Sequence, residues 1–552
     1  MKEFAYFGKP ALPLGDEIEC EAKCGDRSEN YYLIANKPAP NTQIHAREID
    51  YYLESSDEDA LEISKNVSIL YEARALAFDG SKFEKYSKTV GNRVLFIGTN
   101  PDMSLKASLE KLDFKVICLD EINFIYGCAG ELCAIIEQGL EQAEVECDFA
   151  VFFGGCESWA TRQSGCFDAS AISAKEILEF LSSHAPNYTY QNYIFCQNDA
   201  CLYHHKRGDV CSKCVELCPT VAILKNEDEK ELVFSPIDCI ACGRCVSVCP
   251  SGAIDNAVIT RTSFEALGRL FKSRIPIIAK DGFLPKVRFK NSVLPLVLPS
   301  DGILDFNNIL SLVLGCGGEI FIFLPNMPKA SKEAVALANE IFKARFDCEL
   351  VRVFDDEISL QEAISKAKYK NIGEFELGVY PNKASAISAK LALIADSLDL
   401  GEFSTYESTA HGKISVDESK CTLCASCAGA CPTSALITDS ANNALCFNES
   451  LCIGCGYCVI SCAESQTISL KKGKMHINTE FFKPKELAKD ELFACVECGK
   501  EFATKKAVEK IASILSPAFS GDEKKLRTLY CCAECKAKLM ILSQSDEGVL
   551  DV

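Results

Sequence analysis

Short apolar runs alternate with helical patterns in two stretches of the chain, one on each side of residues 201–249. The first stretch has apolar runs and helical patterns at 93–98, 104–112, 114–120, 148–155 and 171–181. The second repeats the alternation at 294–299, 319–325, 332–346 and 348–354. Such alternation is typical of parallel strands covered by helices. It predicts two parallel α/β domains, at residues 91–195 and 259–412.

The remaining segments complete a predicted multidomain fold that is α/β with α+β parts. At 552 residues the chain has room for several domains, because one domain usually takes about 100 to 200 residues. Residues 1–90 contain a helical stretch at 57–78 and no motif that assigns them a role. The cysteine-rich parts are two modules at 196–258 and 413–475 and a tail at 485–552.

Composition narrows the class of protein. Hydrophobic residues make up 48% of the chain and charged residues 25%, and no apolar run approaches the roughly 18 to 20 residues of a membrane helix. The N-terminal sequence shows no basic patch followed by an apolar stretch. We therefore expect a cytoplasmic protein without membrane insertion. A net charge of −20 disfavours binding to nucleic acid and anionic lipid, so the expected partners are proteins.

Cysteine is the unusual residue, with 33 in the chain. Because a cytoplasm keeps thiols reduced, a cysteine-rich cytoplasmic protein usually uses them to bind metal. Twenty-one of the 33 fall into three groups, at 201–249, 421–462 and 495–535.

The second group is an internal repeat of C-x2-C-x2-C-x3-C. It comprises Cys421, Cys424, Cys427 and Cys431, then Cys452, Cys455, Cys458 and Cys462, each set after a short β-like run. Thiolates spaced in this way surround a [4Fe–4S] cubane, and the fourth cysteine is expected to open a helix that points at the other cluster. The repeat resembles the bacterial two-cluster ferredoxin motif.

That resemblance implies two [4Fe–4S] clusters whose ligands cross between the halves. One set would be Cys421, Cys424, Cys427 and Cys462, and the other Cys452, Cys455, Cys458 and Cys431. Ala463 follows Cys462 where the family usually has proline. This departure should weaken the start of the helix expected there and leave the ligand intact.

The first group carries the same pattern with one enlarged loop. Cys239, Cys242, Cys245 and Cys249 form a second half, and Cys211, Cys214 and Cys218 supply three cysteines of a first half. By the same resemblance, the fourth comes from Cys201 or from the nearby Cys196. The implied sets are Cys201, Cys211, Cys214 with Cys249, and Cys239, Cys242, Cys245 with Cys218.

Zinc binding, or burial of the thiols as small hydrophobic side chains, remains as an alternative for this first group. His204 and His205 lie in the enlarged loop and are expected near water, although they could tune or ligate a cluster.

The tail contains two C-x2-C pairs, Cys495 with Cys498 and Cys532 with Cys535, with Cys531 as a spare. Four thiolates in two pairs suit a tetrahedral zinc ion. A helical pattern at 505–515 lies between the pairs. The tail is thus predicted to be a zinc knuckle with a helix, and another iron–sulfur cluster or no metal are the alternatives.

Twelve cysteines show no ligand spacing and are expected to be buried free thiols. They are Cys20, Cys24, Cys118, Cys128, Cys133, Cys147, Cys156, Cys166, Cys196, Cys316, Cys348 and Cys446. A fifth cluster built from Cys128, Cys133, Cys156 and Cys166 remains open.

No motif for catalysis was found, including phosphate-binding loops, zinc-protease motifs and nucleophile elbows. FIGTNPDMS (96–104) and LGCGGEI (314–320) resemble fragments of nucleotide loops, but the full dinucleotide pattern is missing. We expect both segments to be turns of the scaffold.

The order of modules resembles a wider family, the cytoplasmic multi-cluster iron–sulfur proteins associated with formate dehydrogenases. The similarity rests on C-x9-C-x2-C-x3-C-P at 201–219, CTLCASCAGACPTSAL at 421–436 and FACVECGKEFAT at 493–504. It implies service to formate dehydrogenase or a similar redox enzyme, as electron partner or accessory factor. Together with the cysteine groups, this leads us to expect an electron-transfer protein with four [4Fe–4S] clusters and one zinc ion. The alternatives are an accessory or maturation factor for that enzyme and an oxidoreductase subunit with an unrecognised flavin or nucleotide site.

Overall fold

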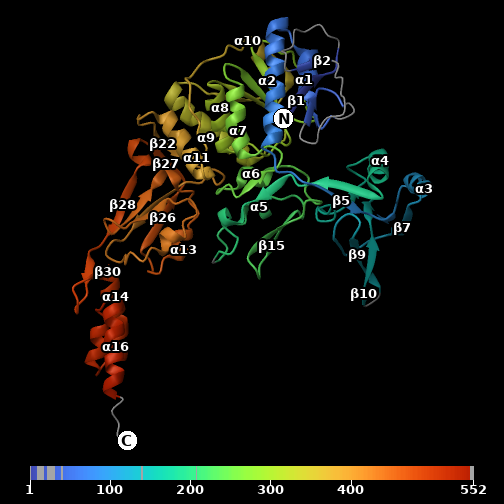
Figure 1. The fold of residues 1–552 in the computed structure, drawn as a ribbon. Helices are drawn as coiled ribbons and strands as arrows, with labels where there is room; N and C mark the ends of the chain where they lie inside the picture. The colour runs from blue at the N-terminus through green and yellow to red at the C-terminus, as the bar shows by residue number, and fades with distance from the viewer. Residues whose placement is uncertain are drawn as a thin grey trace. The chain divides into compact units, whose positions relative to one another are not determined.

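The structure is a computed structural model that describes residues 2–8, 18–20, 32–38, 42–138, 141–206 and 208–547 (Figure 1). The chain forms two compact units. The first comprises Met1–Lys206 with Cys211–Val379, and the second comprises Arg207–Val210 with Tyr380–Val552. Within the described residues, no helix has the length and apolar character needed to cross a membrane.

The first predicted α/β domain contains a parallel sheet in the order β12-β11-β6-β7. Its strands and helices are β6 (Arg93–Ile97), α3 (Met103–Lys111), β7 (Lys115–Leu119), β11 (Phe149–Phe152), β12 (Cys166–Asp168) and α4 (Ala174–His184). These elements confirm the predicted alternation. The helices pack on the sheet face that carries Val94, Phe96 and Val151.

The opposite face of this sheet is covered by an antiparallel sheet that the sequence pattern did not predict. The sheet comprises β8 (Phe124–Tyr126), β9 (Leu132–Gln138) and β10 (Glu141–Cys147). Leu132 and Ala134 meet Leu95, Ile97 and Phe152 in one hydrophobic core. A further pair, β5 (Lys85–Thr89) with β13 (Asn187–Gln191), is also antiparallel.

The second predicted α/β domain contains a parallel sheet in the order β19-β18-β20-β21. Its elements are α7 (Arg261–Leu270), β18 (Ile275–Lys280), β19 (Val293–Leu298), α8 (Phe306–Cys316), β20 (Ile320–Phe323), α9 (Lys329–Phe346), β21 (Val351–Val353) and α10 (Glu357–Lys366). All six residues of β19 are buried, as a parallel strand covered on both faces requires.

Residues from the N-terminal region form a small parallel sheet and two helices. Their bounds are β1 (Lys2–Tyr6), β2 (Ile18–Cys20), β3 (Tyr32–Ala35), β4 (Ile44–His45), α1 (Arg47–Ser55) and α2 (Ala60–Asp79). Helix α2 confirms the predicted helical stretch. Asp59 caps it by accepting a hydrogen bond from the Glu62 backbone N–H at 2.9 Å.

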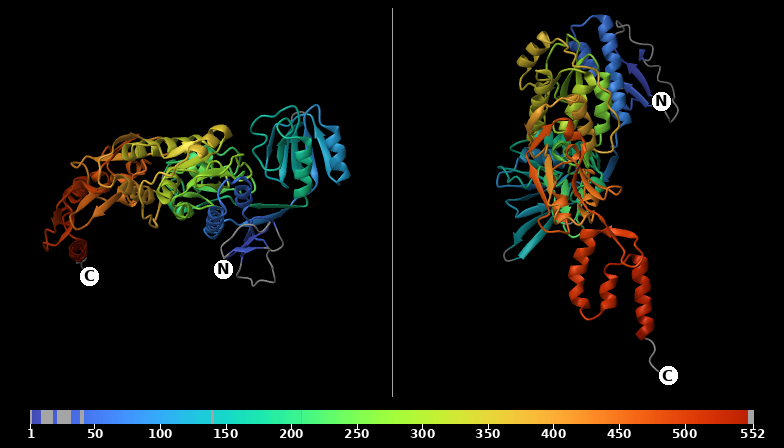
Figure 2. Two further views of the ribbon diagram at one scale, coloured as in Figure 1. Left: turned by 90° about the horizontal axis from the view of Figure 1, so that it is seen from above. Right: turned by 90° about the vertical axis from the view of Figure 1, so that its left-hand side faces the viewer.

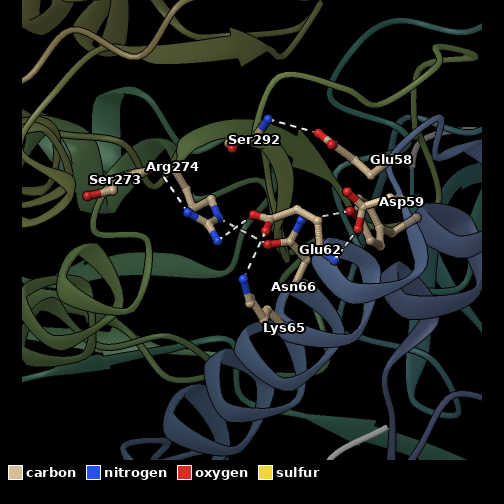
Figure 3. A network of polar contacts seen from close by, with 9 residues as sticks. Glu58, Asp59, Glu62, Lys65, Asn66, Ser273, Arg274 and Ser292 are labelled. Atoms are coloured by element: carbon tan, nitrogen blue, oxygen red, sulfur yellow. Dashed lines mark hydrogen bonds and ion pairs between the residues drawn. The ribbon is translucent and has the colours of Figure 1, made fainter. Parts of the chain in front are cut away.

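Helices α1 and α2 dock on the second α/β domain. Figure 3 shows Arg274 reaching from that domain to helix α2, where it donates to Glu62 Oε1 at 2.6 Å and to Asn66 Oδ1 at 3.0 Å. The Ser292 backbone N–H donates to Glu58 Oε1 at 2.9 Å. Phe289 is fully buried beneath them. The N-terminal helices therefore complete the core of a domain more than 200 residues away in sequence.

The larger segment of the second unit, from Tyr380, contains α11 (Lys383–Ala395) and continues into the second cysteine module. The strands that frame this module are β22 (Gly401–Ser404), β23 (Gly412–Val416), β24 (Leu436–Asp439), β25 (Ala444–Asn448), β26 (Ile468–Lys472), β27 (Lys474–Ile477) and β28 (Pro484–Lys489). Strand β28 joins β24 and β25 as the third strand of an antiparallel sheet. Its lysine-rich sequence did not indicate a strand.

The tail forms a knuckle followed by short helices. Its elements are β29 (Leu492–Ala494), β30 (Glu501–Thr504), α14 (Lys505–Leu515), α15 (Glu523–Thr528) and α16 (Ala533–Glu547). Figure 2 shows these helices, coloured red, extending from the strands of the second cysteine module. Helix α14 has the bounds expected from its pattern.

Candidate metal centres

The three C-x2-C-x2-C loops, at Cys239–Cys245, Cys421–Cys427 and Cys452–Cys458, share an uncommon backbone geometry. In each loop, the residue before the second cysteine and the residue after it are left-handed. The φ values are 57° at Ala241, 73° at Gly243, 53° at Leu423, 62° at Ala425, 62° at Gly454 and 82° at Gly456. Left-handed turns of this kind gather successive N–H groups into a concave anion-binding nest. The geometry is costly at alanine and leucine, which indicates a functional constraint.

Backbone N–H groups also point at the cysteine sulfurs. Tyr203 N lies 3.5 Å from Cys201 Sγ, and Ile254 N lies 3.5 Å from Cys249 Sγ. Burial raises the pKa of the Cys452 thiol to about 12, and the N–H groups of Gly454 and Gly412 act in the opposite direction. Such donors stabilise thiolates, the form in which cysteine binds iron.

The fourth cysteine of each half lies beside the cysteines of the other half in the first module. Burial raises the pKa of Cys214 to about 12, and the thiols of Cys249, Cys211 and Cys201 add to the rise. Cys218 similarly adds to the raised pKa of Cys239, where burial is again the main cause. The structure therefore brings together the two crossed sets that the repeat implies.

The second module has the same crossed arrangement. Cys462 lies close enough to Cys421 and Cys427 to raise the pKa of both, after the larger effect of burial. Cys431 acts in the same way on the other half, at Cys452, Cys455 and Cys458. A cavity of about 140 Å³ is lined by the four thiols of one crossed set, Cys421, Cys424, Cys427 and Cys462.

The helices of these modules differ from the expectation that the fourth cysteine opens one. A short helix instead starts one residue before the third cysteine and ends one or two residues before the fourth. The helices are α5 (Lys213–Glu216), α6 (Arg244–Val248), α12 (Ser426–Gly429) and α13 (Tyr457–Ser461). Because no helix starts after Cys462, the concern about Ala463 does not apply.

Cys201 and Cys196 both reach the first crossed set, in different roles. Strand β14 (Ile194–Cys196) pairs with β17 (Ile254–Asn256), which places Cys196 opposite Ile254 and near Cys249. A hydrogen bond between the two thiols raises the pKa of Cys196 and lowers that of Cys201 to about 6. Cys201 Sγ also accepts a hydrogen bond from the Tyr203 backbone N–H at 3.5 Å, which favours its thiolate form.

Replacing Cys201 with serine should lower the iron content by about one cluster, or about four atoms per chain. Cys196→Ser should keep that iron, because Cys196 is not one of the four ligands in this assignment. Iron analysis of the anaerobically purified variants measures both. Loss of iron from Cys196→Ser alone would identify Cys196 as the ligand.

One loop of the first module packs directly on the second α/β domain. A Cβ atom added to Gly302 would lie 2.4 Å from the Cys242 carbonyl oxygen, and one added to Gly243 would lie 2.6 Å from Ser300 Oγ. Gly302 belongs to the turn that follows β19, at the carboxyl edge of the parallel sheet. The Cys239–Cys245 loop thus fits against the backbone of that turn.

The tail brings four thiols much closer together. The Sγ atoms of Cys495, Cys498, Cys532 and Cys535 all lie within 4.8 Å of one another, and Cys498 Sγ is 3.8 Å from Cys532 Sγ. Four thiolates around one zinc ion, each at about 2.3 Å, would be about 3.8 Å apart. Cubane ligands bind four different iron atoms and are more widely spaced. The tail thus has the geometry of a site for a single ion.

The other thiols and N–H groups around the tail site are consistent with this geometry. Although burial acts to raise it, N–H groups of Cys532, Cys498 and Glu497 lower the pKa of Cys495 to about 6. The spare Cys531 instead donates to the Arg527 carbonyl at 3.3 Å. It lies outside the four-thiol group, as the sequence predicted.

The tail is attached to the second cysteine module by polar contacts. Thr504 Oγ1 donates to the Thr422 carbonyl at 2.9 Å, and Lys510 pairs with Glu464. Thr422 follows Cys421, and Glu464 lies two residues after Cys462. Both line the same cavity as the four thiols of that crossed set. The tail therefore covers part of one proposed cluster site.

The remaining cysteines occupy several environments. Cys133, Cys147, Cys166 and Cys316 are buried as expected. Cys118 is exposed, contrary to expectation, because β7 is an edge strand whose outer residues face solvent. Cys24 and the side chain of Cys20 lie outside the described residues.

Of the four cysteines considered for a fifth cluster, Cys156 lies near Cys166, whereas Cys128 makes a contact elsewhere. Cys128 accepts from Lys88 at 3.2 Å, and Cys156 lies beside Asp168. Cys133 and Cys166 are buried on strands β9 and β12.

Neither nucleotide-like fragment forms a phosphate-binding turn. In FIGTNPDMS, Asp102 caps helix α3 by accepting from Ser104 N and Leu105 N at 2.8 and 3.1 Å. A phosphate at this N-terminus would meet a carboxylate. LGCGGEI contains the C-terminus of α8, whose partial charge is negative and repels phosphate. Both segments are turns of the scaffold, as expected.

Two family models, each described as a 4Fe-4S dicluster domain, match the chain at residues 209–253 and 413–463. No curated protein matches it. The second match includes all eight cysteines of its repeat. The first begins after Cys201, which is the cysteine displaced by the enlarged loop. The chain therefore carries two ferredoxin-type 4Fe-4S dicluster domains.

Proposed function

We propose that this protein transfers single electrons through four [4Fe–4S] clusters, two in each dicluster domain. The observation that carries the proposal is the cavity lined by four thiols drawn from both halves of one repeat. Three of these thiols come from one loop with an anion-binding nest, and Cys462 comes from the other half. This arrangement suits an iron–sulfur cluster, because the thiols can bind its iron atoms and the N–H groups of the nest can donate hydrogen bonds to its sulfides.

Such clusters supply one-electron redox chemistry, and iron held entirely by cysteine has no position open to substrate. The chain's own residues bind the clusters, exclude water and set the potential. Buried Cys245, Cys249, Cys427 and Cys458 line the inner side of the sites. Cys424 is exposed, so its crossed set lies at the surface of the second unit. We infer that electrons enter or leave there.

In this proposal the ligand sets are those implied by the repeat, and Cys495, Cys498, Cys532 and Cys535 bind one zinc ion. The resemblance to proteins associated with formate dehydrogenases supports such an enzyme, or a related cytoplasmic redox enzyme, as the partner. The acidic net charge of −20 favours a basic docking surface on that partner.

The first test is a count of iron, sulfide and zinc in anaerobically purified protein. About 16 iron atoms, about 16 sulfides and about one zinc ion per chain are expected, with four iron atoms in each cubane. A colourless preparation, or one that contains only zinc, would contradict the proposal.

The second test asks what the clusters do. Formate with formate dehydrogenase should reduce them rapidly, which gives a loss of absorbance in the visible range. Stoichiometric capture of an immature dehydrogenase subunit without electron flow would instead support a maturation factor.

A further inference from the structure

We propose that His204, His205 and Glu231 form a binding site for one divalent transition-metal ion, separate from the thiol sites. The two histidines belong to the enlarged loop after Cys201, and Glu231 begins strand β16 (Glu231–Phe234). Their ligand atoms all lie within 4.8 Å of one another. This site is independent of the proposed electron transfer, because no cluster ligand takes part in it.

The distances between the three ligand atoms fit a single ion. Glu231 Oε1 lies 3.2 Å from His205 Nε2 and 3.8 Å from His204 Nε2. Around zinc, with nitrogen or oxygen ligands at about 2.0 to 2.1 Å, tetrahedral neighbours are about 3.4 Å apart. The two distances lie on either side of this value. An ion would need only small side-chain rotations to bind.

The backbone fixes His205 in the orientation of a metal ligand. Its N–H donates to the Lys230 carbonyl at 2.9 Å, and its Nδ1 lies 3.2 Å from the Glu229 carbonyl oxygen. A carbonyl only accepts hydrogen bonds, so Nδ1 carries the proton and the neutral ring leaves Nε2 with a free lone pair. Histidines that bind metals typically donate their other ring N–H to such a carbonyl.

The groups around His205 Nε2 favour the binding of a cation. A bare ring nitrogen and a carboxylate oxygen at 3.2 Å repel each other unless a metal ion or a proton lies between them. The nearby lysines do not supply this positive charge, because they interact with other groups. Lys225 and Lys230 form ion pairs with Glu227 at 3.8 and 2.8 Å, and both ammonium groups lie over the Tyr203 ring. The proposed metal ion would balance the negative charge of the Glu231 carboxylate by binding to it.

Two imidazoles and one carboxylate are the ligands of catalytic zinc sites and of non-haem iron sites. The His205 side chain is 63% exposed, so water can complete the coordination. A bound ion would connect the enlarged loop to the hairpin of β15 (Ile223–Asn226) and β16. It would thereby hold the segment that carries Cys201, three residues before His204.

The test uses zinc K-edge X-ray absorption on the full-length, anaerobically purified protein after addition of one further equivalent of Zn²⁺ and removal of unbound ion by gel filtration. The wild-type spectrum should contain Zn–N/O distances of about 2.0 to 2.1 Å. If the tail holds zinc as proposed, a sulfur shell at about 2.3 Å will be present too. His205→Ala and Glu231→Gln should lose the N/O shell while the iron content per chain stays unchanged.

The matched control is His476→Ala, which removes an exposed histidine that pairs with Asp399 at 2.8 Å. This control should retain the N/O shell. In competition with a fluorescent chelator, Glu231→Gln should weaken binding of the additional Zn²⁺ at least about tenfold. A wild-type spectrum with a sulfur shell only, or an N/O shell that persists in His205→Ala, would overturn the proposal. A tail without zinc would remove only the sulfur shell.

Discussion

Replacing Cys431 and Cys452 together should cost the protein about four iron atoms per chain, whereas replacing Cys431 and Cys421 together should cost about eight. The difference follows from the crossed arrangement of the second module. Cys431 lies with Cys452, Cys455 and Cys458, although it belongs to the loop of Cys421. Cys431→Ala and Cys452→Ala therefore damage the same cluster. Iron analysis of the two double variants measures the difference.

Single variants and one leftover cysteine provide the controls for this experiment. Cys431→Ala and Cys452→Ala should each cost about four iron atoms, which shows that the module tolerates the loss of one cluster. Cys446→Ser should cost none, because Cys446 lies on β25 outside both crossed sets. If each repeat held its own cluster, the results of the two double variants would be reversed.

Removing the metal from the tail should unfold it. The hydrophobic core there consists of buried Cys495, Cys531 and Cys532, with Phe502, Cys535 and Leu539 packed against it. A core of this size cannot stabilise a domain by itself, whereas zinc binding in finger peptides contributes about 10 to 16 kcal/mol. Cys532→Ala should therefore abolish zinc binding. Trypsin should then cleave rapidly at Lys524 and Lys525, whereas the wild-type tail with zinc bound should resist cleavage there.

Cys531→Ser is the matched control for the tail. Cys531 is the neighbour of Cys532 and is buried to a similar degree, but it donates to the Arg527 carbonyl and lies outside the four-thiol group. Serine keeps that hydrogen bond. This variant should retain zinc and resist trypsin. A Cys532→Ala variant that remains resistant would show that the helices are stable without metal.

Much of the scaffold could be predicted because strands buried on both faces leave a clear sequence pattern. The runs at 93–98 and 294–299 became β6 and β19, and the pattern at 505–515 became α14. The cysteine spacing predicted the loops of both dicluster domains. Spacing works here because a rigid cage fixes how many residues separate two ligands.

Other features depend on contacts that sequence periodicity does not record. Strand β28 is rich in lysine, and its pairing with β25 comes from backbone hydrogen bonds. The docking of α2 depends on Arg274, which lies over 200 residues away. The prediction of a helix after each fourth cysteine was wrong. A short helix instead follows each second cysteine and ends before the fourth. The position of Cys196 opposite Ile254 depends on the pairing of β14 with β17.

The close approach of Gly243 and Gly302 also bears on how the protein can be dissected. The segment matched as a dicluster domain, residues 209–253, is shorter than the piece of chain that should fold independently. Excised alone, it would lack Cys201 and would expose the backbone that normally faces the turn after β19. Fragments for spectroscopy of this half should therefore extend through the second α/β sheet, and transplanting the cysteine motif alone into another scaffold should not reproduce its redox properties.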